Sequence, residues 1–255
     1  MDIPEILGKS DEEQFEASPI YVRAHGVLFA GTFHNKNPEE YPSQKKQFLR
    51  HLNSSDHVFV ETPDNVKPGT KATTFEELVH FNAGRRVKVL EGELNHLALA
   101  RSYGLGAENY VIYSSLFYIH EAVEANRSFF DYASKKIPGF IRDLSDRDKL
   151  DLEYVISSLM SINRPVMKNP NQFIRFGNAV ALYFMQVRDA NLLGPALAKY
   201  LDLKGSKMVV VGAGHVENLL KFLEGEDINP PMWDDFVKAP EIQGTSQQMQ
   251  EILGR

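Results

Sequence analysis

The chain has 255 residues, a length that suits one large domain or one domain carrying an insertion. Its 34 acidic and 28 basic residues give a formal net charge of -6, and no run of like charges forms the basic face typical of nucleic-acid binders. The chain contains no cysteine, which excludes disulfides, iron–sulfur clusters, Cys-ligated zinc and a Cys nucleophile.

The amino-terminal residues lack the pattern of an exported or membrane-anchored protein. Asp2, Glu5 and the acidic run at 11–13 stand where a secretory signal needs basic and then apolar residues. The longest apolar stretch, at 179–187, is shorter than the roughly 20 residues that a membrane helix requires. We therefore expect a cytoplasmic protein with no membrane partner and no nucleic-acid partner.

The first hundred residues alternate between strand and helix patterns after a polar lead-in at 1–18, which we expect to be loose. The apolar run at 27–30 is typical of a buried strand, and Thr74 and Glu77 have the spacing of a helix capping box. In chain order we expect strands at 21–30, 57–61 and 87–91 and helices at 43–52, 74–84 and 93–102. Such alternation favours a mostly parallel sheet.

The middle of the chain is helical in pattern. We expect helices at 114–136 and 145–162, a proline-containing loop at 163–171, and a helical stretch at 173–200 with a kink at Gly194-Pro195. A strand at 207–211, a turn and a helix at 217–223 follow, and then an irregular tail that packs back through Trp233 and Phe236. The predicted fold is a single α/β domain, 1–255, with a mostly parallel central sheet flanked by helices and a helical insertion at about 110–200.

Two distant segments share one pattern, an apolar strand that runs into Gly-x-x-His. The first ends in Gly31–His34 and the second in Gly212–His215. Glycine lets the backbone turn where a Cβ would clash. Because ligands of open α/β sheets bind beyond the carboxyl ends of the strands, we expect both imidazoles to face one crevice.

Carboxylates occupy equivalent places on two other predicted strands. Glu61 closes the strand at 57–61 and Glu91 closes the strand at 87–91. With His34 and His215, these side chains could bind a divalent metal with open coordination positions. They could equally act as a general base and a general acid without a metal. Each residue taken alone could also be an ordinary turn or strand-end residue, and this reading is favoured for Glu91.

Other patterns are weaker. His120 and Glu124 have the i, i+4 spacing of a helical metal pair, but such a pair is more often a solvated ion pair. The glycines at 212–214 suggest a dinucleotide-binding turn, yet Glu217 occupies the position of the third glycine. The Gly-x-Ser-x-Gly motif of serine hydrolases is absent.

The chain resembles the TraB/PrgY/GumN/Tiki superfamily, which is related more distantly to erythromycin-esterase-like and ChaN-like proteins. The resemblance rests on the first Gly-x-x-His segment at 28–34 with its continuation at 38–42, and on the apolar strand that ends in Glu at 58–61. It rests also on an Arg-Asp helix at 187–192 followed by the second strand and Gly-x-x-His at 208–215. The order and spacing of these segments agree with the family pattern.

The resemblance implies an α/β fold with a catalytic cleft at both Gly-x-x-His turns. It implies that His34 and His215 are metal ligands or acid–base residues, that Glu61 is their carboxylate partner and that Arg188 stabilises charge. Tiki members resemble metal-dependent peptidases that favour manganese or cobalt, erythromycin-esterase-like relatives are hydrolases, and ChaN-like relatives bind haem iron. This chain departs from the family in lacking the export signal or membrane helices of several branches.

From these residues we expect a hydrolase, acting with or without a bound metal, whose substrate is a peptide or a small amide or ester. The candidate catalytic residues are His34, Glu61, Arg188 and His215, and the candidate ligands of a divalent manganese, cobalt or zinc ion are His34, Glu61 and His215. Two alternatives stay open: a non-catalytic protein that binds haem or a small ligand, and a lyase or isomerase that uses the same His and Glu residues for proton transfer.

Overall fold

The computed structural model describes residues 10–33, 36–61, 72–90, 96–106, 170–240, 242–244 and 246–247. The chain divides into two compact units. The first comprises Met1–Leu94 and Met185–Pro230, and the second Asn95–Phe184 and Pro231–Arg255. Across the described ranges, no helix is both long and apolar enough to cross a membrane.

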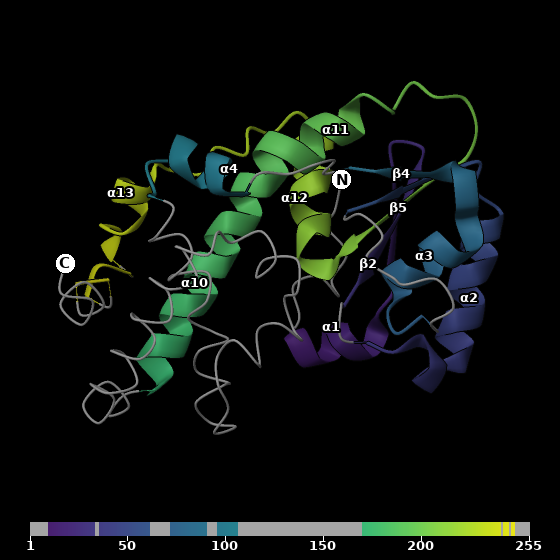
Figure 1. Cartoon of the computed structure of the whole chain (residues 1–255), viewed down its shortest axis with the longest axis horizontal. Helices are drawn as coiled ribbons and strands as arrows, with labels where there is room; N and C mark the ends of the chain where they lie inside the picture. The colour runs from purple at the N-terminus through teal and green to yellow at the C-terminus, as the bar shows by residue number, and fades with distance from the viewer. Residues whose placement is uncertain are drawn as a thin grey trace, which may run out of the picture. The chain divides into compact units, whose positions relative to one another are not determined.

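A five-stranded sheet with the strand order β1-β2-β5-β3-β4 forms the centre of the first unit (Figure 1). The strands are β1 (Ile20–Ala24), β2 (Val27–Thr32), β3 (His57–Val60), β4 (Val87–Val89) and β5 (Lys207–Gly212). Strand β5 lies between β2 and β3 and is parallel to both, β4 is parallel to β3, and only β1 is antiparallel to its neighbour. The mostly parallel α/β sheet expected from the sequence is thus confirmed.

The amino-terminal part of the sheet differs from the prediction of one strand at 21–30. The structure has an antiparallel hairpin in which Ala24 pairs with Val27. The two residues between them, His25 and Gly26, have φ values of 50° and 73°. Two successive positive φ values are what a tight two-residue hairpin turn requires, and the apolar residues on both sides concealed this turn in the sequence.

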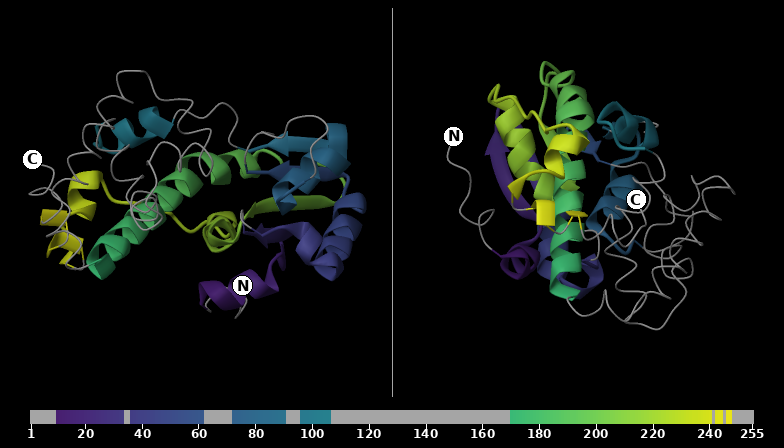
Figure 2. Two further views of the ribbon diagram at one scale, coloured as in Figure 1. Left: turned by 60° about the horizontal axis from the view of Figure 1, so that its bottom comes forward. Right: turned by 90° about the vertical axis from the view of Figure 1, so that its left-hand side faces the viewer.

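Helices cover both faces of the sheet, so that the first unit has three layers (Figures 1 and 2). Helices α2 (Pro42–Asn53) and α3 (Phe75–Ala83) pack on one face, and α11 (Gly194–Ala198) and α12 (Ala213–Leu223) pack on the other. Successive strand residues point to opposite faces: Phe29 and Val209 belong to the α12 layer, whereas Ala30 and Val210 belong to the α2 layer. This alternation explains why β2 and β5 are continuous apolar runs.

Helix α3 begins and ends where the sequence predicts. Thr74 caps its first turn, and the Glu77 side chain reaches back to the backbone of Thr74 to complete the capping box. Gly84 ends the helix with a φ of 53°. Helix α2 likewise occurs at the predicted place, one residue longer at each end.

The lead-in expected to be loose contains a short helix, α1 (Asp11–Ala17), which is capped at its start by Ser10 and Glu13. Lys36, although cationic, is fully buried, and its Nζ donates hydrogen bonds to Phe15 O at 2.5 Å and Glu16 O at 3.0 Å. A cation that binds the last carbonyls of a helix complements the helix dipole. Lys36 therefore attaches α1 to the chain that follows β2.

A π-helix interrupts the helical stretch predicted at 173–200. Helix α10 (Pro170–Arg188) runs into a π-helix (Asp189–Leu193), and α11 follows at Gly194. The sequence-based prediction placed the irregularity at Gly194-Pro195, whereas the structure places it immediately before. The Gly194 N–H donates to Asp189 O, and a Cβ on Gly194 would lie 2.7 Å from the Phe222 ring. This glycine is needed for close packing against α12.

The described part of the second unit consists of α4 (His96–Ser102), the first part of α10 and α13 (Trp233–Phe236). The Tyr183 ring stacks on Phe236 with centroids 4.3 Å apart and lies 5.7 Å from Trp233 in an edge-to-face contact. The predicted packing of the tail through Trp233 and Phe236 is therefore confirmed, but these residues form helix α13 and not the irregular segment that the sequence predicted. The helices predicted at 114–136 and 145–162, with His120 and Glu124, lie outside the described residues.

Candidate active site

The candidate site lies at the carboxyl-terminal edge of the parallel strands. Thr32, the last residue of β2, pairs with Gly212, the last residue of β5, while Val60 of β3 pairs with Val210. Strand β5 then leads directly into α12, as the left panel of Figure 2 shows. The register therefore brings the ends of three strands and the start of one helix together.

The two Gly-x-x-His glycines have different roles. Gly31 lies inside β2, where an added Cβ would come within 2.9 Å of the Val216 side chain and 3.1 Å of the Ala213 backbone. Gly212 ends β5 and is the N-cap residue of α12. The expectation that both glycines act by turning the backbone is wrong for Gly31, which instead lets α12 approach the sheet.

Glu61 is the central carboxylate of the site. It follows β3 directly, and only 1% of its surface is exposed. Its Oε2 accepts the Gly212 backbone N–H at 2.9 Å, and its Oε1 accepts from Arg188 Nη2 at 2.5 Å and lies 3.3 Å from His215 Nε2. The start of α12 also favours a negative charge through the helix dipole. A buried carboxylate with these partners is suited to remain ionised.

His215 lies in the first turn of α12 and has carboxylates on both sides. Its Nδ1 is 2.6 Å from Asp189 Oδ1, opposite the contact of Nε2 with Glu61. Asp189 is fully buried, and its second oxygen accepts a hydrogen bond from the Asn218 side-chain amide at 2.7 Å. Asp189 and Asn218 thereby fix the rotation of the imidazole ring.

The buried charges shift the titration of His215 strongly. Burial by itself would lower the pKa of the His215 imidazole, but the charges and hydrogen bonds of Glu61 and Asp189 outweigh it and raise that pKa to about 10. Burial also raises the pKa of the Asp189 carboxyl, against the opposing effect of His215. At neutral pH His215 is therefore a buried imidazolium between the Glu61 and Asp189 side chains, with the Arg188 guanidinium as the second cation.

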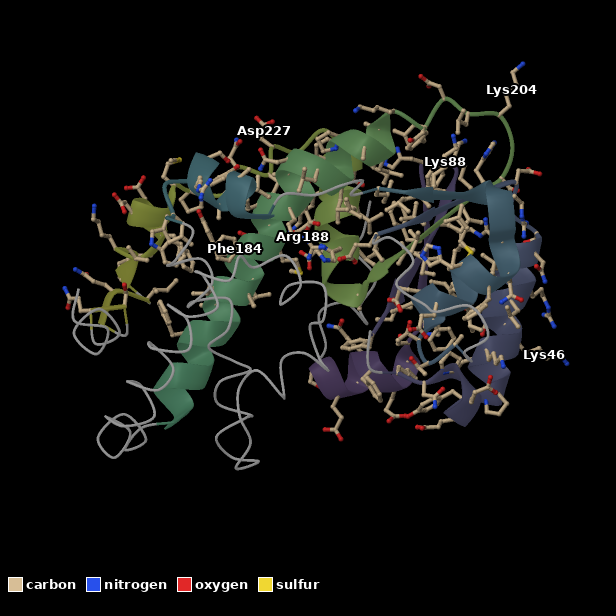
Figure 3. The ribbon with its side chains drawn as sticks, in the orientation of Figure 1. Lys46, Lys88, Phe184, Arg188, Lys204 and Asp227 are labelled. Atoms are coloured by element: carbon tan, nitrogen blue, oxygen red, sulfur yellow. The ribbon has the colours of Figure 1, made fainter. Side chains whose placement is uncertain are left out.

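Arg188 connects this buried group to the outside. It is the last residue of α10, directly before the π-helix, and Figure 3 shows it beside α12. Its side chain is 21% exposed, whereas the Glu61 side chain is 2% exposed. Inserted turns of π-helix are frequent at functional sites. Here the two residues at the start of the π-helix contact different side chains of the site. Arg188 pairs with Glu61, while Asp189 pairs with His215.

Three of the four predicted site residues, Glu61, Arg188 and His215, come together in one hydrogen-bonded group. The fourth, His34, lies outside the described residues. The described strand ends two residues before His34, at Thr32, which pairs with Gly212. Glu91, the weaker carboxylate candidate, also lies outside the described residues.

Sequence reasoning missed Asp189 and Asn218. The sequence marks Asp189 only as the neighbour of Arg188 in the Arg-Asp helix at 187–192. A usable signal was present, since Asp189 is followed closely by apolar Leu192 and Leu193 on a helix that the pattern predicts to be half-buried. An aspartate in such a setting needs a buried partner, and only the structure identifies that partner as His215.

A further buried carboxylate was also missed. Glu76 lies in the first turn of α3 and is 5% exposed. Its side chain shares a hydrogen bond with the hydroxyl of Thr32, at the end of β2. The sequence offered no signal for it, because Glu76 stands among the ordinary acidic residues of a helix start.

Two of the proposed metal-binding atoms are close enough to share one ion. Glu61 Oε1 and His215 Nε2 are 3.3 Å apart, and both atom types bind divalent transition metals. The bond between His215 Nδ1 and Asp189 resembles the outer carboxylate that orients many metal-binding histidines. Within the described ranges no group of three His, Asp or Glu residues is arranged to hold a metal. The third predicted donor, His34, lies outside those ranges.

Comparisons of the chain with protein-family models, with curated proteins and with solved structures found no match.

Proposed function

We propose that this protein is a hydrolase that cleaves a peptide or another small amide or ester at the carboxyl-terminal edge of its sheet. The observation that carries the proposal is the buried group Asp189–His215–Glu61–Arg188, held by contacts of 2.5 to 3.3 Å. Burying several charged groups is costly. Such an arrangement with strongly shifted titration is typical of functional sites.

The proposed cofactor is a divalent manganese, cobalt or zinc ion held by Glu61, His215 and His34. Glu61 and His215 fit this role because their facing atoms are 3.3 Å apart and Asp189 occupies the other ring nitrogen. When bound, such an ion lowers the pKa of a coordinated water and so supplies a nucleophile at neutral pH. The resemblance of the Gly-x-x-His segments to the TraB/PrgY/GumN/Tiki superfamily supports the same choice.

The residues of the chain itself would supply orientation, charge and proton transfer. Asp189 holds His215 so that Nε2 faces Glu61, and the Gly212 N–H holds Glu61. Arg188 is the one member of the group whose side chain is more than a tenth exposed, which suits it to contact a substrate carbonyl. A guanidinium at that position would stabilise the negative charge that develops on the oxygen of the substrate.

Kinetic assays with a panel of peptide, amide and ester substrates test this function. Protein depleted of metal is assayed with and without added Mn²⁺, Co²⁺ or Zn²⁺, alongside the His215→Gln and Glu61→Gln variants. We expect metal-stimulated turnover in the wild-type protein and its loss in both variants. Equal turnover in the wild-type and both variants would refute the assignment. An absorbance scan of the purified protein tests the haem-binding alternative, which predicts a Soret band.

A further inference from the structure

One peptide group connects the two buried glutamates of the sheet edge. The peptide between Val211 and Gly212 has its carbonyl on Val211 and its N–H on Gly212. The carbonyl accepts a hydrogen bond from the Thr32 hydroxyl at 3.1 Å, and the N–H donates to Glu61 Oε2 at 2.9 Å. The Thr32 hydroxyl is also hydrogen-bonded to Glu76. Glu76, Thr32, the peptide and Glu61 therefore form a continuous chain of hydrogen bonds.

All the members of this chain of hydrogen bonds are buried. Thr32 and Glu61 are each 1% exposed, and Glu76 is 5% exposed. Hydrogen bonds in a low-dielectric interior polarise one another, so that donation to one end of a peptide strengthens donation from its other end. Donation by the Thr32 hydroxyl to Val211 O thus strengthens the bond from the Gly212 N–H to Glu61.

The Thr32 hydroxyl has a single hydrogen, and the acceptor of that hydrogen decides the direction of the hydrogen-bond chain. If that hydrogen goes to Val211 O, the hydroxyl oxygen accepts from Glu76, which must then carry a proton. If it goes to an ionised Glu76, Val211 O loses this donor and the peptide is less polarised. The first arrangement satisfies both the carboxyl and the carbonyl at the observed positions.

We infer that Glu76 and Thr32 are positioning residues for Glu61, acting through the Val211–Gly212 peptide. Glu76 is the protonated carboxyl and donates to Thr32, Thr32 donates to Val211 O, and Gly212 donates to Glu61.

The direct test is the amide proton shift of Gly212, measured by NMR on protein labelled with ¹⁵N-glycine. This proton moves downfield as its hydrogen bond strengthens, and the measurement needs neither metal nor substrate. We expect an upfield shift in Thr32→Val and Thr32→Ala, which lack the hydroxyl, and a return to the wild-type position in Thr32→Ser. Thr73→Val is the matched control, because Thr73 also bonds a glutamate, Glu77, but is exposed.

The Glu76→Gln variant tests the protonation state, because a glutamine amide can donate to Thr32 as a neutral carboxyl does. We expect the Gly212 amide proton to stay at its wild-type position in this variant. A downfield move would show that Glu76 is ionised in the wild-type protein and would overturn the inferred direction. An unchanged Gly212 shift in the hydroxyl-free Thr32 variants would overturn the relay itself.

The consequence for turnover rests on the proposed hydrolase function. Weakening one hydrogen bond to Glu61 should lower kcat by roughly two- to tenfold with little change in KM, and Thr32→Ser should restore kcat. The NMR result and the kinetic result separate the two ideas. A shifted Gly212 amide in a protein that hydrolyses nothing would leave the relay intact and reject the function.

Discussion

The two ends of the same sheet treat their polar residues in opposite ways. At the amino-terminal ends of β3 and β5, exposed Asp56 accepts hydrogen bonds from the Ser206 N–H at 2.8 Å and the Ser206 hydroxyl at 2.9 Å. Gly205 permits this contact, since its φ is 102° and a Cβ would lie 2.7 Å from the Asp56 carboxylate. At the carboxyl-terminal ends, Glu61, Asp189 and His215 are almost fully buried.

The difference in burial between the two edges indicates that they have different roles. The exposed Asp56–Ser206 contacts join two strand starts and could be replaced by water, so they suit a structural connection. The buried charges at the other end cannot turn to water, and each depends on its neighbours for compensation. A fold gains little from such a group, so its presence at the edge where α/β proteins bind ligands favours a functional role.

The largest effect is expected on replacing His215 by glutamine. Both Glu61 and Asp189 would lose their shared cation, so the free energy of unfolding should fall by about 3–5 kcal/mol, as for other broken buried ion pairs. Urea unfolding followed by circular dichroism measures this change. Ser206→Ala at the opposite end of the sheet is the control, and its free energy of unfolding should fall much less than that of His215→Gln. Equal losses in the two variants would contradict the contrast between the edges.

The Arg188–Glu61 pair should show strong coupling. In a double-mutant cycle with Arg188→Met and Glu61→Gln, we expect a coupling free energy of about 1–3 kcal/mol, because the two side chains share a charged contact in a buried setting. The exposed Lys45–Glu39 pair provides the comparison, and its coupling should not exceed about 1 kcal/mol. If the coupling free energy of Arg188 and Glu61 is as small as that of the exposed pair, burial does not strengthen the Arg188–Glu61 interaction.

Stability should depend on pH differently at the two edges. The folded state raises the pKa of His215 from 6.5 to about 10, so its stabilising contribution is complete below pH 6.5 and is lost as the pH rises toward 10. In metal-free protein the urea midpoint should fall across this range more steeply for the wild type than for His215→Gln. Parallel midpoint curves would show that the imidazole is not held charged.

Replacing Asp56 should have the smallest effect on stability. The pH dependence of the Asp56 contribution should be opposite in sign to that of His215. Hydrogen bonds from Ser206 lower the pKa of the Asp56 carboxyl below 3.8, so its contribution is present above that pH and is lost as the pH falls further. Asp56→Asn should therefore differ most from the wild type near neutral pH and least in acid, with hydrolytic activity unchanged. A large loss of activity in Asp56→Asn would contradict the proposal that the active site lies at the carboxyl-terminal edge of the sheet.

Much of the fold could be predicted from the sequence because its local signals agree with one another. The apolar strands 57–61 and 207–211, the capping box at Thr74 and the stop at Gly84 all occur in the structure. The hairpin at His25 could not be seen, because a non-glycine residue with positive φ leaves no compositional mark. The π-helix after Arg188 was missed for a similar reason, since residues 189–193 contain no proline or glycine that would mark an irregular turn.

The candidate site could be predicted only in part. Position at a strand end marked Glu61 and His215, because parallel strands bring such residues to one edge. Asp189 and Glu76 come from helices, and which helical residues face the sheet edge depends on how each helix packs. The sequence predicted neither the contact of Asp189 with His215 nor that of Glu76 with Thr32.

Calorimetric titration of metal-depleted protein with Mn²⁺, Co²⁺ and Zn²⁺ tests the central proposal most directly. We predict that at least one ion binds with a stoichiometry near one, that Glu61→Gln and His215→Gln abolish this binding, and that Asp56→Asn preserves it. Binding at pH 7 should also release about one proton, because the metal must displace the proton that His215 carries. Absence of binding in the wild-type protein, or equal binding in all three variants, would contradict the account.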